Sequence, residues 1–132
     1  MRLGHLTVLT KDLEKSIEFY TLLGGTKISE DLFKYENGDT EHIVHMRFDG
    51  DATIELIDPS HKDVAAIETA PLEHFCFEVE NVDETVSKLR AKGIDSFVDE
   101  EPHHEQLFYP NGIRVMFLTG PSGESIELLQ KL

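Results

Sequence analysis

Four polar residues form a pattern that occurs twice along the 132-residue chain, and this repeat constrains the fold more than any other feature. His5 begins a strand-like run and Glu55 follows fifty positions later, while His74 begins a similar run and Glu127 follows fifty-three positions later. A histidine early and a glutamate late, at nearly the same interval, predict two copies of one structural unit. Two such units could bring two imidazoles and two carboxylates together around one divalent metal ion.

The first unit is predicted to contain a strand, a helix and three further strands. Residues 3–9 alternate in polarity, as a half-buried strand does. Asp12 is the expected N-cap of a helix that stops at Gly24-Gly25. The three strands that follow are expected at Thr26–Ser29, His42–Phe48 and Thr53–Ile57, and the last two should form a hairpin that turns at Asp49-Gly50-Asp51.

The second unit repeats this order. A strand at residues 73–79 is followed by a helix that begins at the cap Asn81, with Glu84 at the capping-box position, and ends at Gly93. The further strands are expected at Ile94–Val98, Ile113–Leu118 and Ser125–Leu129. The sequence therefore predicts an α+β fold with two mixed sheets, each backed by one helix, rather than a doubly wound parallel sheet. We expect a single domain over 1–132, with module one at about 1–58, a linker at 59–71 and module two at about 72–132.

The four repeated residues share an orientation within their strands. Side chains alternate across a strand, so Glu55 points away from Ile54 and Leu56, and Glu127 points away from Ile126 and Leu128. The two histidines are likewise opposite apolar neighbours. We expect the apolar face to pack under the helix of its unit and the polar face to line a cleft.

The amino-acid composition limits the kinds of molecule that the protein is expected to bind. The 26 acidic residues outnumber the 12 basic ones, and the net charge of −14 argues against nucleic acid and anionic membranes as partners. No apolar run approaches the roughly 18 residues of a membrane span, and the N-terminus lacks the pattern of a signal peptide. Cys76 is the single cysteine, so an internal disulfide is impossible. A cytoplasmic protein is the expected class.

The chain resembles the vicinal oxygen chelate superfamily (glyoxalase/bleomycin resistance/dioxygenase), whose members include glyoxalase I and methylmalonyl-CoA epimerase. The resemblance covers essentially the whole chain. Its carriers are Gly-His-Leu-Thr-Val with His5, the segment Leu-Glu-Lys-Ser-Ile-Glu-Phe-Tyr, Ile-Glu-Leu with Glu55, His-Phe-Cys-Phe-Glu-Val with His74, and Gly-Pro-Ser-Gly-Glu-Ser-Ile-Glu-Leu with Glu127.

The resemblance implies paired βαβββ modules that form an open, barrel-like mixed sheet with a metal-binding cleft. It implies His5, Glu55, His74 and Glu127 as metal ligands, and it implies a homodimer, as in many members. The ligands come from two chains in some members and from one chain in others, and the sequence leaves both arrangements open. Leu9 and Pro59 stand where glutathione-dependent bacterial glyoxalases carry Arg and Asn. An epimerase would more often carry Gln than Glu at position 55.

Two carboxylates and two imidazoles suit Ni, Zn, Co, Mn or Fe as a divalent cofactor. We expect a metal-dependent lyase or isomerase of the glyoxalase I type (lactoylglutathione lyase-like) that transfers a proton between adjacent carbons of a small molecule through a metal-bound enediolate. Glu127 is the first choice for the residue that carries the proton and Glu55 the second. The alternatives are an epimerase of the methylmalonyl-CoA type, or a non-enzymatic protein of the same fold that binds an antibiotic or another small molecule. A ring-cleaving dioxygenase fits less well, because that branch usually uses two His and one Glu.

Other polar residues receive smaller roles. The run His103-His104-Glu105 follows Pro102 and is expected to form a flexible lid rather than a metal site. His42 and His45 lie on opposite faces of their predicted strand and are poor joint ligands. Cys76 shares a face with His74, but no base is assigned beside it, so a nucleophilic role is not expected.

Overall fold

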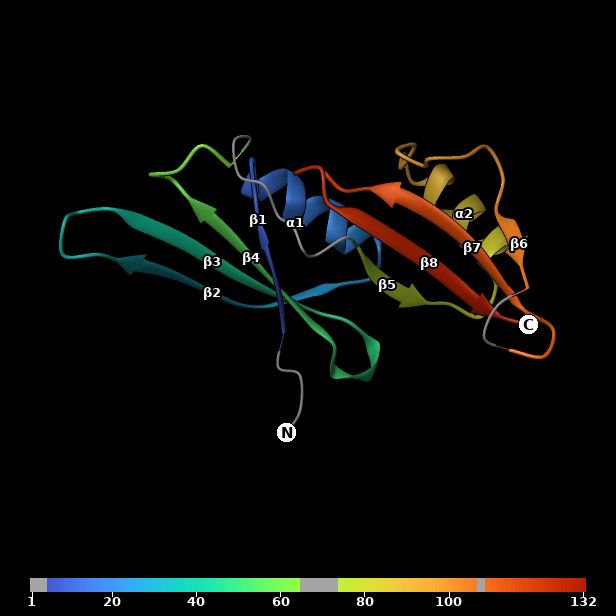
Figure 1. The fold of residues 1–132 in the computed structure, drawn as a ribbon. Helices are drawn as coiled ribbons and strands as arrows, with labels where there is room; N and C mark the ends of the chain where they lie inside the picture. The colour runs from blue at the N-terminus through green and yellow to red at the C-terminus, as the bar shows by residue number, and fades with distance from the viewer. Residues whose placement is uncertain (1–4, 65–73, 107–108) are drawn as a thin grey trace. The chain divides into compact units, whose positions relative to one another are not determined.

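The computed structural model describes residues 5–64, 74–106 and 109–132, which fall into two compact units along the chain, Met1–Glu68 and Thr69–Leu132 (Figure 1). The elements of the first unit are β1 (Leu6–Leu9), α1 (Leu13–Leu22), β2 (Thr26–Lys34), β3 (Thr40–Arg47), the 3-10 turn η1 (Asp49–Asp51) and β4 (Thr53–Pro59). Those of the second unit are β5 (Phe75–Glu78), α2 (Val82–Ala91), β6 (His103–Glu105), β7 (Ile113–Thr119) and β8 (Ser125–Lys131).

Each unit holds one four-stranded sheet of the same topology. The strand order is β1-β4-β3-β2 in the first unit and β5-β8-β7-β6 in the second. The first strand of each unit runs parallel to the last, whereas the other neighbours are antiparallel, so both sheets are mixed and neither closes on itself. The predicted α+β fold of two strand–helix–three-strand units is confirmed. The prediction of one domain over 1–132 stays a prediction.

The two helices begin at the residues that the sequence indicates. The Asp12 carboxylate accepts a hydrogen bond from the Lys15 backbone N–H at 3.1 Å, and the Asn81 side chain accepts one from the Glu84 N–H at 2.9 Å. These caps satisfy backbone donors that have no partner within the helix. Gly24 and Gly93 follow the helices with φ of 100° and 93°, a conformation that glycine adopts without strain.

The apolar core of each unit lies between its helix and one face of its sheet. In the first unit α1 packs on β3 and β4, and Tyr20, Met46 and Leu56 are fully buried. In the second unit α2 packs on β7 and β8, and Met116 and Ile126 are fully buried. The prediction that the apolar face of each sheet lies under its helix is confirmed. The opposite face therefore carries the polar side chains of the strands.

The structure corrects two expected elements. The predicted strand Ile94–Val98 is reduced to one isolated bridge, between Phe97 and Leu118, and the strand beside β7 is β6 instead. The run His103-His104-Glu105, expected as a flexible lid, forms that strand and pairs with β7. Strand pairing uses backbone groups, so polar side chains do not prevent it at the edge of a sheet. The strand predicted at 73–79 corresponds to β5, Phe75–Glu78. Residue 73 of the predicted range lies outside the described part of the chain.

Within the described residues, no helix has both the length and the apolar character needed to cross a membrane.

Candidate metal centre

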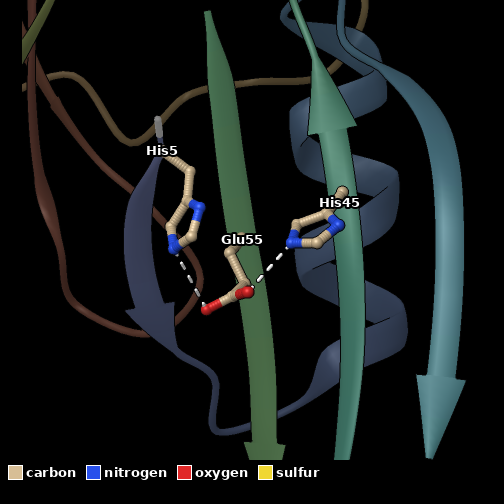
Figure 2. Close-up of side chains that lie close together, drawn as sticks. All are labelled: His5, His45 and Glu55. Carbon is tan, nitrogen blue, oxygen red and sulfur yellow. Dashed lines mark hydrogen bonds and ion pairs between the residues drawn. The ribbon is translucent and has the colours of Figure 1, made fainter. Parts of the chain in front are cut away.

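Glu55 lies at the centre of a polar cluster on the sheet of the first unit. It sits on β4, between Thr7 on β1 and His45 on β3, and it is directly opposite both residues in the strand register. Residues directly opposite each other on neighbouring strands point to the same face of a sheet. Figure 2 shows the rings of His5, which directly precedes β1, and of His45 on β3 directed at the Glu55 carboxylate.

The contacts in this cluster are short. His45 Nε2 lies 2.9 Å from Glu55 Oε2, and His5 Nε2 lies 3.7 Å from Glu55 Oε1 (Figure 2). Thr7 Oγ1 donates a hydrogen bond to Glu55 Oε1 at 3.0 Å. One possible ligand atom from each of His5, His45 and Glu55 lies within 4.8 Å of the other two. Both carboxylate oxygens therefore have polar neighbours within the unit.

Two effects oppose each other at Glu55. Burial raises the pKa of its carboxyl group, but the hydrogen bonds from His45 and Thr7 and the nearby His5 lower it, and the net result is a lowered pKa. The Glu55 side chain is 16% exposed, compared with 47% for His5. The cluster thus holds a carboxylate in its charged form at a position that solvent and a ligand can still reach.

A serine on the next strand contacts the far side of the His45 ring. Ser29 on β2 is opposite His45 in the register, and its hydroxyl lies 2.7 Å from His45 Nδ1. A hydroxyl can donate or accept a hydrogen bond, so this contact is compatible with either neutral tautomer of the ring. The contact fixes the orientation in which Nε2 faces Glu55.

The second unit holds a related but smaller set. His74 Nε2 lies 3.2 Å from Glu127 Oε2. Cys76 on β5 and Phe117 on β7 flank Glu127 in the register, as Thr7 and His45 flank Glu55. The Phe117 ring meets the His74 ring edge to face, with centroids 5.3 Å apart. An aromatic hydrocarbon therefore occupies the position that a histidine takes in the first unit.

The thiol in this second set is a weak acid. Partial burial raises the pKa of Cys76 from 9.0 to about 12, and the negative charge of Glu127 adds to the shift. At neutral pH the sulfur is therefore protonated. This agrees with the expectation that Cys76 is not a nucleophile, because the thiolate is the reactive form.

A family model described as "Glyoxalase/Bleomycin resistance protein/Dioxygenase superfamily" matches residues 2–128. The chain belongs to this superfamily. The chain is 30% identical to human mitochondrial methylmalonyl-CoA epimerase over 105 residues, which cover 75% of the chain and 58% of the epimerase. It is also 30% identical over 132 residues to the uncharacterised protein YwbC of Bacillus subtilis, with 98% of each chain covered.

Solved structures agree with this assignment at the level of the fold. The crystal structure of a glyoxalase family protein from Enterococcus faecalis matches with a TM-score of 0.75 over 98% of this chain and 97% of that protein, at 20% identity. The human epimerase is longer than the matched region, since the alignment spans under three fifths of it. The superfamily and its fold are therefore established for this chain.

The residues of this superfamily member fit a divalent metal. Nitrogen and carboxylate ligands bind such ions at about 2.0–2.2 Å, so two ligands of one ion lie about 3–4 Å apart. The His74–Glu127 and His5–Glu55 distances of 3.2 and 3.7 Å fall in this range. Mixed imidazole and carboxylate donors suit Zn, Fe, Co, Ni and Mn.

The structure brings the predicted ligands together as two pairs, His5 with Glu55 and His74 with Glu127. Their convergence on a single ion stays a prediction, as does the cleft.

Sequence reasoning assigned no role to His45, although a signal was available. The predicted hairpin turns at Gly50, and a hairpin centred there places residue 45 opposite residue 55. His42 makes a separate contact, 2.7 Å from Glu30, so the two histidines do not act on one partner.

Proposed function

We propose that this superfamily member is a divalent-metal-dependent enzyme that transfers a proton at a carbon next to the carbonyl of an acyl thioester, as in methylmalonyl-CoA epimerase. The observation that carries the proposal is the repeated pair: each unit holds a histidine Nε2 within 3.7 Å of a glutamate carboxylate, at corresponding strand positions. A surface that only binds a ligand has no need for two such pairs.

The residues would divide the work. His5, Glu55 and His74 would hold the ion, which when bound acts as a Lewis acid for the negative charge that develops on the substrate oxygen. Glu127 would remove the proton from carbon and return it. Support for this division comes from the hydrogen bonds to Glu55, since His45 and Thr7 occupy its two oxygens and hold them in one orientation. Glu127 lies beside a protonated thiol and a histidine instead.

Two observations favour a thioester over a glutathione adduct as substrate. The human relative that is 30% identical over 75% of this chain is an epimerase of methylmalonyl-CoA. Leu9 and Pro59 stand at the positions where the glutathione-dependent pattern has Arg and Asn. Apolar residues there cannot bind the charged groups of glutathione.

The glyoxalase I reaction is the second candidate, and Glu55 favours it. The epimerase pattern would more often place Gln at this position, whereas this chain has a glutamate whose lowered pKa keeps it charged. A second carboxylate offsets more of the charge of the ion and changes its strength as a Lewis acid. The two candidates share the proton-transfer step and differ in substrate.

The test measures proton exchange directly. The metal-loaded protein is incubated in D₂O with methylmalonyl-CoA, and separately with the hemithioacetal of methylglyoxal and glutathione, and deuterium entering the carbon is followed by NMR. We expect exchange with the thioester that requires metal. Glu127→Gln should slow it by about 10²- to 10⁴-fold, the range that general acid–base catalysis contributes.

A matched control is Glu84→Gln. Glu84 lies exposed on α2, where its carboxylate forms an ion pair with Lys88 on the same helix. That variant should keep the wild-type rate. Exchange that proceeds equally fast in Glu127→Gln, or equally fast without metal, would contradict the proposal. Exchange with the hemithioacetal alone would select the glyoxalase reaction.

We also propose that the protein works as a homodimer, and mixing of variants tests how the ligands are shared. His5→Ala and His74→Ala are inactive alone if both residues hold the ion. If each site draws ligands from two chains, hybrid dimers regain one intact site, and an equal mixture recovers about a quarter of the wild-type rate. No recovery would place each site within one chain.

A further inference from the structure

We infer that the first unit carries a three-ligand metal site of its own, in which His45 Nε2 joins His5 Nε2 and a Glu55 oxygen as a ligand. This inference deepens the proposed function and rests on it for the role of the ion. The superfamily resemblance supplied two ligands from this unit. The third comes from the observed geometry of β3.

The first argument is the placement of the three donors on one rigid surface. His45 and Glu55 are register partners on β3 and β4, and His5 directly precedes β1, which pairs with β4 on its other side. Their ligand atoms lie within 4.8 Å of one another. Three donors at this spacing can occupy one face of a metal ion with small side-chain adjustments, since ligands of one ion lie about 3–4 Å apart.

The second argument is the support behind His45. A histidine that binds a metal usually has a hydrogen-bond partner on its other ring nitrogen, which orients the ring. Ser29 Oγ supplies this contact at 2.7 Å from Nδ1. Without an ion, Nε2 is hydrogen-bonded to Glu55. Because the Ser29 hydroxyl can accept as well as donate, the ring can carry its proton on Nδ1 when an ion binds, which leaves the lone pair of Nε2 for the metal.

The third argument is Thr7, which orients the carboxylate. Its hydroxyl donates to Glu55 Oε1, so the carboxylate is held by a neutral donor as well as by the histidines. Supporting contacts of this kind around ligands are worth about 10- to 100-fold in metal affinity. The first unit therefore has three ligands and two orienting residues, all from its own strands or the residue that precedes them.

The chemical class follows from the donor set. Two imidazoles and one carboxylate on one face of an ion leave other positions open and suit Fe(II), Co, Mn or Zn. With three ligands from the first unit, Glu127 is not required as a ligand. It would then be available to carry the proton.

Zinc titration of the full-length protein tests the inference. In His74→Ala/Glu127→Gln, the second unit loses its paired donors, and we expect one Zn²⁺ per chain still to bind by calorimetry. Adding His45→Phe to this background should weaken binding by about 100-fold or more, because loss of a ligand exceeds the loss of a supporting contact. Phenylalanine is the matched replacement, because Phe117 occupies the corresponding position in the second unit. His45→Gln, with circular dichroism of both variants, controls for misfolding.

A spectrum of the ring nitrogens identifies the ligand atom. With Zn²⁺, a long-range ¹H–¹⁵N correlation should show His45 Nε2 bound to metal and Nδ1 protonated. An Nε2 that keeps its proton, or unchanged zinc affinity in both His45 variants, would overturn the inference and leave the proposed function standing. If the His45 variants lose zinc but the wild type catalyses no proton exchange, the inferred metal site would stand and the proposed function would be contradicted.

Discussion

The two units of this chain carry the same scaffold and different polar sets, and the comparison can be made position by position. His5 and His74 precede the first strands, and Glu55 and Glu127 lie on the last strands. Thr7 beside Glu55 corresponds to Cys76 beside Glu127, and His45 corresponds to Phe117. Ser29, which contacts His45, corresponds to Val98, whose N–H donates to the Phe117 carbonyl at 2.9 Å.

The two units share the His–Glu pair and differ in the residues that surround it. The His–Glu pair is present in both units and is the part that the superfamily resemblance predicts. The residues around it are polar in the first unit and apolar or weakly acidic in the second. The first unit is thus built to hold and orient a carboxylate. Beside its histidine, the second unit places a thiol and an aromatic ring around the carboxylate, where the first unit places a hydroxyl and a second imidazole.

The Cys76 thiol gives the largest expected contrast. With its pKa raised to about 12, it should react with an aromatic disulfide at pH 8 roughly 30- to 100-fold more slowly than in the urea-unfolded chain, after allowance for the higher nucleophilicity of a more basic thiolate. Glu127→Gln should speed the folded reaction, because burial still raises the pKa of the thiol but the added effect of the Glu127 charge is removed. Absorbance of the released thiol measures both rates. Equal rates for folded and unfolded wild type would show that the second unit does not suppress the thiolate.

Removing the support of His45 should produce a comparable change in metal affinity. Ser29→Ala leaves His45 Nδ1 without its hydroxyl contact, and we expect zinc binding to weaken by about 10- to 100-fold. Val98→Ala at the corresponding position is the control and should change the affinity little. Calorimetric titration of both variants compares them. A larger effect from Val98→Ala than from Ser29→Ala would contradict a metal site in the first unit that depends on His45.

The comparison also predicts a gain of function. In His5→Ala/Glu55→Gln, the first unit has lost two of its three proposed ligands, and adding Phe117→His should strengthen zinc binding by the second unit by about 10-fold. The added imidazole would lie opposite Glu127 in the register, as His45 lies opposite Glu55. Adding Val98→Ser should strengthen it further by orienting the new ring. Titration of the three variants in series is the measurement, and no gain at either step would show that the sheet positions are not equivalent.

The smallest expected effect is on stability at low pH in the metal-free protein. The pKa of Glu55 is below its usual 4.5 in the folded chain, so its pairing contributes stability above pH 4.5 that is lost as the pH falls through the lowered pKa. His45→Phe should remove about 1 kcal/mol of this contribution at pH 7. Urea unfolding at pH 7 and pH 3 measures it. A variant that loses as much stability at pH 3 as at pH 7 would attribute the loss to packing instead.

Local patterns in the sequence predict most of the scaffold and the two His–Glu pairs that the structure brings together. Alternation within strands placed Glu55 opposite the apolar face, and Asp12 and Asn81 marked the helix starts, because each depends on neighbours in the chain. His45 was missed because its partner depends on strand register, which the turn at Gly50 indicates but strand propensity does not. The prediction of a flexible lid at His103-His104-Glu105 was wrong because it also depended on a distant strand: pairing with the backbone of β7 makes this polar run a strand.

The turn between β3 and β4 has a consequence for relatives of this protein. Gly50 and Asp51 both adopt positive φ, at 75° and 63°, and this tight connection determines which β3 residue lies beside Glu55. Insertion or deletion of one residue there would rotate every β3 side chain to the other side of the sheet and replace His45 by a hydrophobic neighbour. Homologues that keep every ligand but differ in the length of this loop should therefore be grouped apart when annotation is transferred.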